Sequence, residues 1–213
     1  MKTNIKKRVI KGTAILAMSL FASFYTYAGS PEANFEFLKE KNGIDLYYRW
    51  LTMPEGNKVR QMKAVLEYNG TTDDVLNLLK DEKRALEWIP SAEQFRNLTQ
   101  AGGPDWVSYI QFSIPWPFAD QDCILEYTTR QDADGSTVIT FRTNENYLSP
   151  IEGMGRMKDI VGSFVIHPLP GGKCTLECYF LSTKASKIPK WITEPIITGS
   201  LLSLVESLRN ELA

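Results

Sequence analysis

The chain has 213 residues, of which 43% are hydrophobic and 23% are charged, and it contains a single histidine. This length suits one domain with a sizeable core, and the sequence has no internal repeat or low-complexity tract. A single histidine excludes His-based metal clusters and argues against a Ser-His-Asp site. No glycine-rich loop follows a predicted strand and opens a helix, so the sequence predicts no nucleotide site.

The amino-terminal segment has the order of features typical of a secretory signal peptide. Residues 2–11 include five basic and no acidic side chains, residues 12–25 are uncharged and largely apolar, and residues 26–28 read Thr-Tyr-Ala. This order predicts export with cleavage after Ala28. The apolar stretch is shorter than the roughly 20 residues of a spanning helix, although an uncleaved anchor is the alternative. We expect an exported bacterial protein, periplasmic or secreted, with a signal peptide over 1–28.

Cleavage would leave one domain over 29–213 and change its charge. The whole chain carries 24 Lys and Arg against 25 Asp and Glu, and the leader holds five of the basic residues and no acidic one. The mature domain then has 19 basic and 25 acidic residues, a net charge of −6. An acidic domain is a poor partner for nucleic acid and has no general attraction to anionic lipid surfaces.

The first part of the mature chain predicts both helices and strands. An amphipathic helix is expected over 32–41, ended by Gly43, and strands are expected over 44–51 and 58–68. The apolar residues that share one face of the later strand are Met62, Ala64, Leu66 and Tyr68, and most of its polar positions are Arg60, Gln61, Lys63 and Glu67. Residues 71–74 offer N-cap side chains for a short helix, and a further helical turn over 84–88 ends at Pro90.

The rest of the chain predicts β structure followed by one long helix. Six segments bounded by Gly, Pro, Asp or Asn are expected to be strands: 93–99, 106–113, 121–130, 137–144, 156–167 and 173–182. Tight connections over 132–135 and 170–172 favour antiparallel pairing. After Pro189, apolar residues recur at spacings of three and four: Ile197, Leu201, Leu204, Val205, Leu208 and Leu212. Because such a stripe must lie on an apolar surface, we expect an α+β fold in which this helix crosses a long antiparallel sheet.

Three cysteines follow the leader: Cys123, Cys174 and Cys178. Cys174 and Cys178 lie about 13 Å apart if they share one strand, which is beyond disulfide reach. We favour three small buried thiols, with a bridge from Cys123 across the sheet as the alternative.

The segment over 106–127, WVSYIQFSIPWPFADQDCILEY, resembles the central signature of START (StAR-related lipid-transfer) domains. In that family an aromatic strand leads into a Pro-Trp-Pro-like turn, here at 115–118, and then into an Arg-Asp-Phe-like strand opening, here at 121–123. Other similar motifs stand in the family's order at 88–90, 155–156, 162–169 and 188–192. Gln121 and Cys123 depart from the pattern, and a charged pair found inside some sterol-binding members has no clear counterpart. The ligand class therefore does not carry over.

The resemblance implies a helix-grip fold, in which a curved antiparallel sheet wraps around the long carboxy-terminal helix. It implies a non-enzymatic module that binds, and in some relatives transfers, a lipid or other hydrophobic ligand in an internal cavity. No cofactor or metal is expected, and the expected partners are an apolar small molecule and a transient membrane contact, without nucleic acid. The candidate ligand-binding residues are Tyr109, Phe112, Trp116, Phe118, Tyr127, Arg156, Ile192 and Ile196.

Several of these residues have a second interpretation. Arg156 either meets a ligand head group inside the sheet or forms a salt bridge at its edge, with Asp122 or Glu152 as partner. Trp116 and Phe118 either gate the cavity or cap the core. The apolar residues of the last helix are either core or cavity wall.

Two other functions compete with lipid binding. One is a cyclase- or hydrolase-type enzyme that acts on an aromatic or polyketide-like substrate in the same cavity, since one fold hosts many functions. It is favoured if four polar residues converge in one pocket, namely Arg156, Asp122, Tyr109 and Tyr127. The other is an interaction protein with a filled core.

Overall fold

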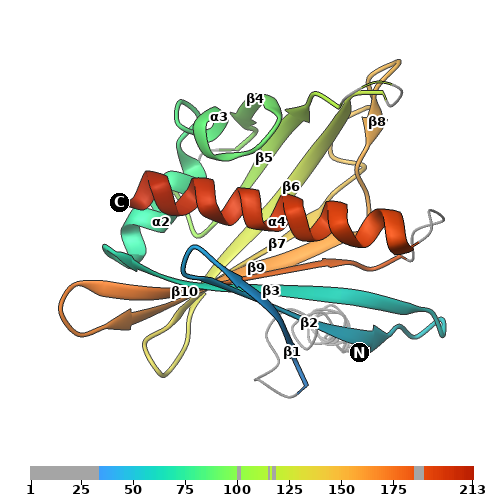
Figure 1. Cartoon of the computed structure of the whole chain (residues 1–213). Helices are drawn as coiled ribbons and strands as arrows, with labels where there is room; N and C mark the ends of the chain where they lie inside the picture. Colours follow the sequence, from blue (N-terminus) through green and yellow to red (C-terminus); the bar gives the residue numbers. More distant parts are fainter. Residues whose placement is uncertain (1–33, 100–101, 115, 117–118, 185–189) are drawn as a thin grey trace, which may run out of the picture.

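The computed structural model describes residues 34–99, 102–114, 116, 119–184 and 190–213. In chain order the elements are β1 (Glu36–Lys41), β2 (Ile44–Thr52), β3 (Lys58–Asn69), α2 (Thr72–Lys80), α3 (Ala85–Trp88), β4 (Ala92–Asn97), β5 (Asp105–Phe112), β6 (Gln121–Gln131), β7 (Thr137–Thr143), β8 (Gly155–Arg156), β9 (Ile160–Leu169), β10 (Lys173–Ser182) and α4 (Lys190–Leu212). The helix α4 crosses the sheet, as expected from its apolar stripe (Figure 1).

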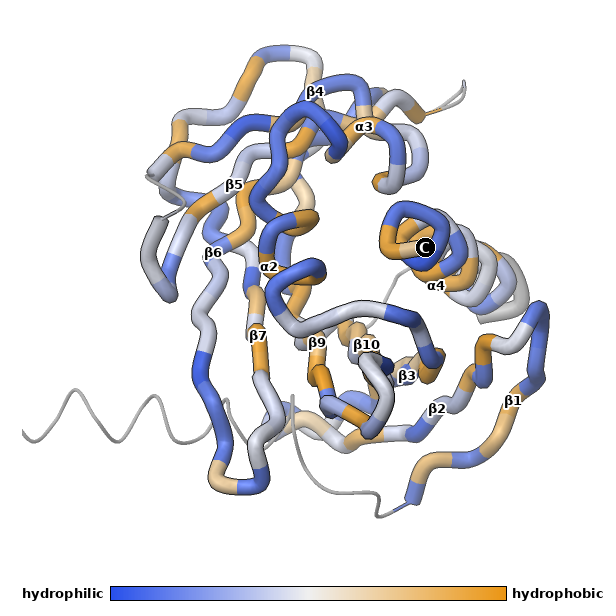
Figure 2. The backbone as a smooth tube through the Cα atoms, turned by 90° about the vertical axis from the view of Figure 1, so that its left-hand side faces the viewer, coloured by the Kyte–Doolittle hydropathy of each residue, from blue (hydrophilic) through white to orange (hydrophobic). Residues whose placement is uncertain are grey.

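The described strands form a single sheet in the order β1-β2-β3-β10-β9-β7-β6-β5-β4. All neighbours along this path are antiparallel, and the short β8 pairs with β6 in parallel. The predicted tight connections over 132–135 and 170–172 join β6 to β7 and β9 to β10. Figure 2 looks along α4 and shows the strands curving around it, so the helix-grip fold is confirmed.

The segment before Gly43 is a strand, so the predicted helix over 32–41 is wrong for the part that the structure describes. β1 pairs with β2, and Lys41 stands opposite Ile44 across a two-residue turn. Both turn residues have positive φ, 54° at Asn42 and 75° at Gly43. An Asn-Gly pair in this conformation is the type I′ hairpin turn, whose twist matches that of the flanking strands. Gly43 therefore marks a hairpin and does not end a helix.

Alternation along the strands gives the sheet two faces. The face toward α4, here called the inner face, holds the main core, in which α4 residues such as Leu208 pack with β3 residues such as Met62 and β10 residues such as Leu176. The opposite, outer face carries smaller clusters, one built on Tyr109 and Ile124. Residue parity therefore decides which side chains lie under the helix.

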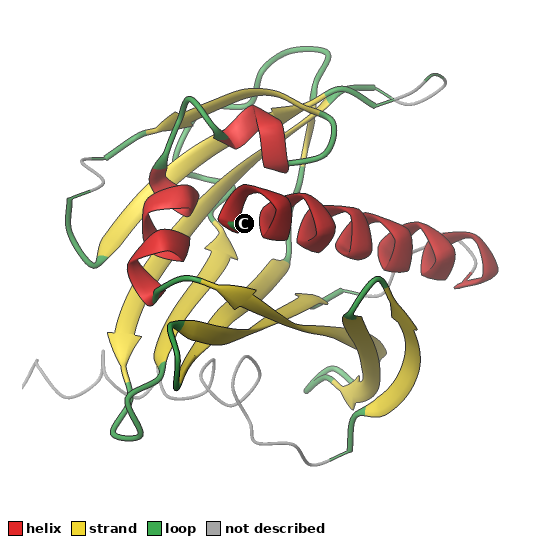
Figure 3. Ribbon diagram, turned by 60° about the vertical axis from the view of Figure 1, so that its left-hand side comes forward, coloured by secondary structure: helices red, strands yellow, loops and turns green. Residues whose placement is uncertain are grey.

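The helices lie together on the inner side, where α4 contacts α2, α3, β2 and β3 (Figure 3). The predicted N-cap at 71–74 is present, because the Thr71 backbone N–H donates to Asp74 Oδ2 at 2.7 Å. This bond, together with one from the Thr71 hydroxyl, lowers the pKa of Asp74. Within the described residues, no helix is long and apolar enough to cross a membrane.

Candidate functional site

The inner face of the central strands is uncharged and rich in aromatic rings. Within the described strands β10, β9, β7, β6 and β5, the inner positions carry no Lys, Arg, His, Asp or Glu. Four rings form a row across these strands. Trp106 stacks on Tyr127 with centroids 4.5 Å apart, Tyr127 lies 6.0 Å from Phe141, and Phe141 lies 5.6 Å from Phe164. We call these four residues the aromatic row.

Gly162 makes room for this row. It stands on β9 opposite Phe141, and a Cβ atom at this position would collide with the Phe141 ring and with the carbonyl oxygen of Tyr179. The carbonyl belongs to the neighbouring strand and cannot turn away, so only glycine fits here. The Phe141 ring thus lies directly on the sheet backbone.

Some hydrogen-bonding capacity on the inner side is unused. The indole N–H groups of Trp88 and Trp106 and the hydroxyl of Thr129 are buried and have no hydrogen-bond partner among the described residues. A buried polar group without a partner costs about 1–3 kcal/mol. Indole groups only donate, so a molecule that satisfied them would have to supply acceptors.

The Trp106 ring is also covered from the α2 side. Lys80 places its Nζ 4.5 Å from the ring centroid and donates to the Gly103 carbonyl at 3.0 Å. Burial lowers the pKa of Lys80. This end of the aromatic row is therefore closed by a cation held in place by the backbone.

One arginine reaches the inner side from β3. Arg60 stands two residues before Met62, on the same face, with its guanidinium 4.4 Å from the Tyr48 ring centroid. Its Nη1 lies 3.5 Å from Oε2 of Glu194 on α4, and its buried Nε has no partner among the described residues. In the sequence, Arg60 counts among the polar positions of the predicted strand. The alternation that runs from Met62 to Tyr68, continued one step back, was the signal that places it under α4.

Arg156 is fully engaged on the outer face. Its Nε and Nη2 donate to Asp122 Oδ1 and Oδ2 at 2.6 and 2.8 Å, and its Nη1 donates to the Leu148 carbonyl at 2.6 Å. Further bonds go to the carbonyls of Glu145 and Ser149. Both side chains of the ion pair are almost completely buried. Asp122 precedes the inner-facing Cys123, so the pair lies away from α4 and fastens the segment after β7 to β6.

Three other predicted residues separate between the two faces. Tyr127 belongs to the aromatic row, and Phe112 packs at the edge of the same core. Tyr109 lies on the outer face, where its hydroxyl is 3.9 Å from Met154 Sδ and the Arg96 guanidinium is 4.9 Å from its ring centroid. Burial raises the pKa of Tyr109. Asp122, Arg156 and Tyr109 thus cluster on one face of the sheet while Tyr127 lies on the other.

The remaining predicted residues are exposed or undescribed. Trp116 is 92% exposed in the connection between β5 and β6, and Ile196 is 61% exposed near the start of α4. Phe118 and the side chain of Ile192 lie outside the described part of the chain.

The three cysteines are buried and free. Burial raises the pKa of the Cys123 thiol to about 12 and also raises the pKa of Cys178. They act as small apolar residues, as the sequence favoured, and no bridge joins Cys123 to β10. No group of three or more His, Cys, Asp or Glu side chains among the described residues is arranged to hold a metal ion.

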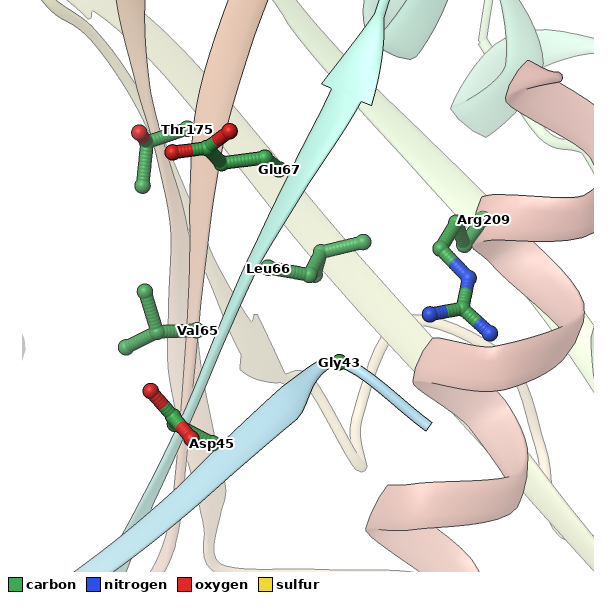
Figure 4. A pocket seen from close by; sticks show the side chains of 7 residues that line it. All are labelled: Gly43, Asp45, Val65, Leu66, Glu67, Thr175 and Arg209. Atoms are coloured by element: carbon green, nitrogen blue, oxygen red, sulfur yellow. The ribbon is translucent and has the colours of Figure 1, made fainter. Parts of the chain in front are cut away.

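A separate pocket of about 450 Å³ lies where the β1–β2 hairpin turn meets the last residues of β3 (Figure 4). Its lining is formed by Gly43, Asp45, Val65, Leu66, Glu67, Thr175 and Arg209. The two carboxylates lie on the side of β3 away from α4, and Arg209 reaches in from the helix. This lining is too polar for an apolar ligand, and none of the predicted site residues belongs to it.

Comparison with known proteins identifies the fold. A STAR-related lipid transfer protein from Xanthomonas axonopodis has a TM-score of 0.73 and 21% identity, covering 84% of this chain and 98% of that chain. Human StAR-related lipid transfer protein 5 has a TM-score of 0.70 and 16% identity, covering 92% and 94%. These likenesses show the fold of START domains, as the sequence resemblance predicted.

Two further relationships extend the comparison. The Zhui aromatase/cyclase from a Streptomyces species has a TM-score of 0.51 and 16% identity, covering 72% of this chain and 93% of that chain. By sequence, the chain is 24% identical over 198 residues to the uncharacterized protein PA1579 of Pseudomonas aeruginosa, covering 92% of this chain and 96% of that protein. No family model matches the chain.

Proposed function

We propose that the protein binds a lipid or another hydrophobic ligand between α4 and the inner face of the sheet. The observation that carries this proposal is the lining: an uncharged surface with the aromatic row and with buried donors that lack partners. The likeness in fold to lipid transfer proteins supports the same role. Binding a chain of about 16 methylenes needs no catalytic group, because burial contributes roughly 0.8 kcal/mol for each methylene.

The first test is to look for the ligand itself. The full chain, expressed with its own leader and purified without detergent, is measured by native mass spectrometry and then extracted with organic solvent. We expect a bound apolar molecule, and we expect the delipidated protein to take up a fatty acid, a phospholipid or a sterol. A protein that carries nothing and takes up none of these probes would refute the proposal and favour an interaction protein with a filled core.

A second test locates the ligand. A brominated fatty acid quenches tryptophan fluorescence at short range, and the buried Trp106 and the exposed Trp116 serve as a matched pair. Trp106→Phe is expected to remove much of the quenching, whereas Trp116→Phe is expected to remove little, because Trp116 is exposed on a loop. The reverse result would place the ligand outside the inner face.

The arrangement of polar residues favours binding over catalysis. Of the four residues whose convergence would support an enzyme, three meet on the outer face, where Arg156 and Asp122 satisfy each other, and Tyr127 lies on the inner face. Because the chain also resembles an aromatase/cyclase in fold, substrate turnover should be measured as well. Conversion of an added aromatic polyketide, abolished by a change on the inner face, would overturn the binding interpretation.

We further propose that the domain is exported and loads its ligand at a membrane. The leader supports export, and the exposed Trp116 and Ile151 lie on adjacent loops, joined where Gly155 N–H donates to the Asp120 carbonyl at 2.8 Å. Exposed tryptophan favours the membrane interface. We expect cell fractionation and amino-terminal sequencing to find a periplasmic or secreted chain that starts at residue 29. A cytosolic chain that retains residue 1 would refute export.

A further inference from the structure

Between the edge strands β1 and β4, the charged residues on the inner face of the sheet are confined to one place; on β1 itself, Glu36 and Lys41 stand opposite Tyr48 and Ile44. The inner positions of the central described strands have none, and those of β2 are Ile44, Leu46, Tyr48, Trp50 and Thr52. On β3 the inner positions from residue 60 to 68 include one charged residue, Arg60. Lys58, at the start of the strand, is exposed. Arg60 is therefore the cation that these strands offer to a charged ligand group under α4, whereas Lys80 of α2 already donates to the Gly103 carbonyl over the Trp106 ring.

The side chain of Arg60 is more buried than that of its ion-pair partner, Glu194. Its side chain is 12% exposed, whereas that of Glu194 is 37% exposed. Tyr48 lies beneath the guanidinium at 4.4 Å, and Trp50 stands opposite Arg60 on β2. A guanidinium that lies on an aromatic ring and largely away from water needs a strong counter-ion.

The pairing with Glu194 does not fill that need. The contact is a single one at 3.5 Å, longer than the roughly 2.7–2.9 Å of a charge-assisted hydrogen bond. Arg156 on the outer face, by contrast, makes two such bonds to one carboxylate, at 2.6 and 2.8 Å. Arg60 Nε, the atom that a bidentate acceptor would use, is buried and has no partner among the described residues.

We propose that the ligand is an anionic amphiphile whose acidic head group binds Arg60 and whose apolar chain extends toward the aromatic row. A carboxylate or a phosphate has the paired oxygens that match the guanidinium fork. Glu194 then acts as a weak internal competitor, and its position on α4 lets it turn to solvent when the head group arrives. This inference rests on the proposed function, because it assumes an apolar ligand under α4.

The test compares head groups on one chain length. Binding of palmitic acid, hexadecanol and a palmitoyl lysophosphatidic acid to the delipidated full chain is measured by calorimetry. We expect the two acids to bind roughly tenfold or more tightly than the alcohol, the scale of a charge-assisted pair. Tighter binding of palmitic acid points to a free fatty acid as the natural ligand, and tighter binding of the phosphate points to a phospholipid.

Three variants test whether Arg60 causes the difference in affinity. Arg60→Gln is expected to remove the preference for acids while hexadecanol binds as before, and Arg60→Lys is expected to restore part of it. Glu194→Gln, which leaves Arg60 in place, is expected to raise the affinity for palmitic acid several-fold because the competitor is gone. Equal binding of acid and alcohol, or Glu194→Gln with unchanged affinity for the acid, overturns this inference but leaves the proposed function standing. Failure of all three probes to bind also overturns this inference, and it refutes the proposed function itself only if a sterol fails to bind as well.

Discussion

The two parts of α4 meet the sheet in different ways. Over 201–212 the helix is packed into the core, with buried residues Leu201, Leu202, Val205, Leu208 and Leu212. Polar contacts reinforce it: Arg84 Nε and Nη2 donate to Glu211 Oε2 at 3.0 and 2.7 Å, and Arg209 donates to the Asn42 carbonyl. Over 193–200, Ile196 is largely exposed, and Glu194 reaches the sheet through its long pair with Arg60.

A proline adds to this difference. Pro195 lies inside α4, has no N–H to donate to the carbonyl of residue 191, and so weakens the first turns of the helix. Segments with few buried contacts open at lower free energy than the packed core. A ligand that enters under α4 would therefore enter at its amino-terminal part, beside Arg60, while the carboxy-terminal part stays fixed to α2, α3 and β3.

The largest expected effect comes from truncating the packed part. Leu208→Ala, at a fully buried position, is expected to lower the free energy of unfolding by about 3 kcal/mol, since a cavity replaces core contacts. Ile196→Ala is the control and is expected to change it by less than about 0.5 kcal/mol. Urea unfolding of the two variants measures both. Equal losses would mean that the two parts are held alike.

The polar contacts of α4 are also expected to contribute more to stability in its carboxy-terminal part than in its amino-terminal part. Arg84→Ala is expected to cost about 1 kcal/mol, because its pair with Glu211 is partly exposed and therefore partly screened. Glu194→Gln is expected to cost less than about 0.5 kcal/mol, given its longer and more exposed contact. A loss for Glu194→Gln as large as for Arg84→Ala would contradict the comparison.

Replacing Pro195 should make the amino-terminal part of α4, residues 193–200, less mobile. Pro195→Ala restores an N–H for the carbonyl of residue 191 and suits the helix better. We expect amide hydrogen exchange over 193–200 to slow several-fold, with exchange over 201–212 unchanged, and ligand release to slow in parallel. Unchanged exchange at both parts would show that the proline does not set the mobility of α4.

The smallest effect concerns the buried thiols. Burial raises the pKa of Cys123 from 9.0 to about 12 and also raises that of Cys178. The folded state thus keeps protons that the unfolded state releases above pH 9, so these thiols favour folding below that pH and lose this contribution as pH rises from 9 toward 12. The rate of thiol labelling at pH 8 is followed by absorbance. We expect this rate to be slow in the unmodified protein, faster in Leu208→Ala and unchanged in Ile196→Ala. Rapid labelling of the unmodified protein would show that the packed part opens.

The sequence predicted most strands because their signals are local. The alternation over 58–68, the turns at 132–135 and 170–172, and the stripe from Ile197 to Leu212 each arise from neighbouring residues, and each agrees with the structure. The prediction of a helix over 32–41 was wrong because Phe35 and Leu38 suit a helix or a strand equally well in so short a stretch. The pairing of β1 with β2 across the Asn42-Gly43 turn makes this segment a strand.

By itself, the sequence determined the α+β class, the order of the elements and, through its motifs, the resemblance to START domains. It left open which face each polar residue takes, because a shift of one position in a strand turns a side chain from one face to the other. Only the tertiary structure paired Arg156 with Asp122 on the outer face and placed Arg60 with Tyr48 and Glu194 under α4. Those placements depend on contacts between distant segments, such as Arg60 and Glu194, which are 134 residues apart. A local sequence pattern carries no information about such contacts.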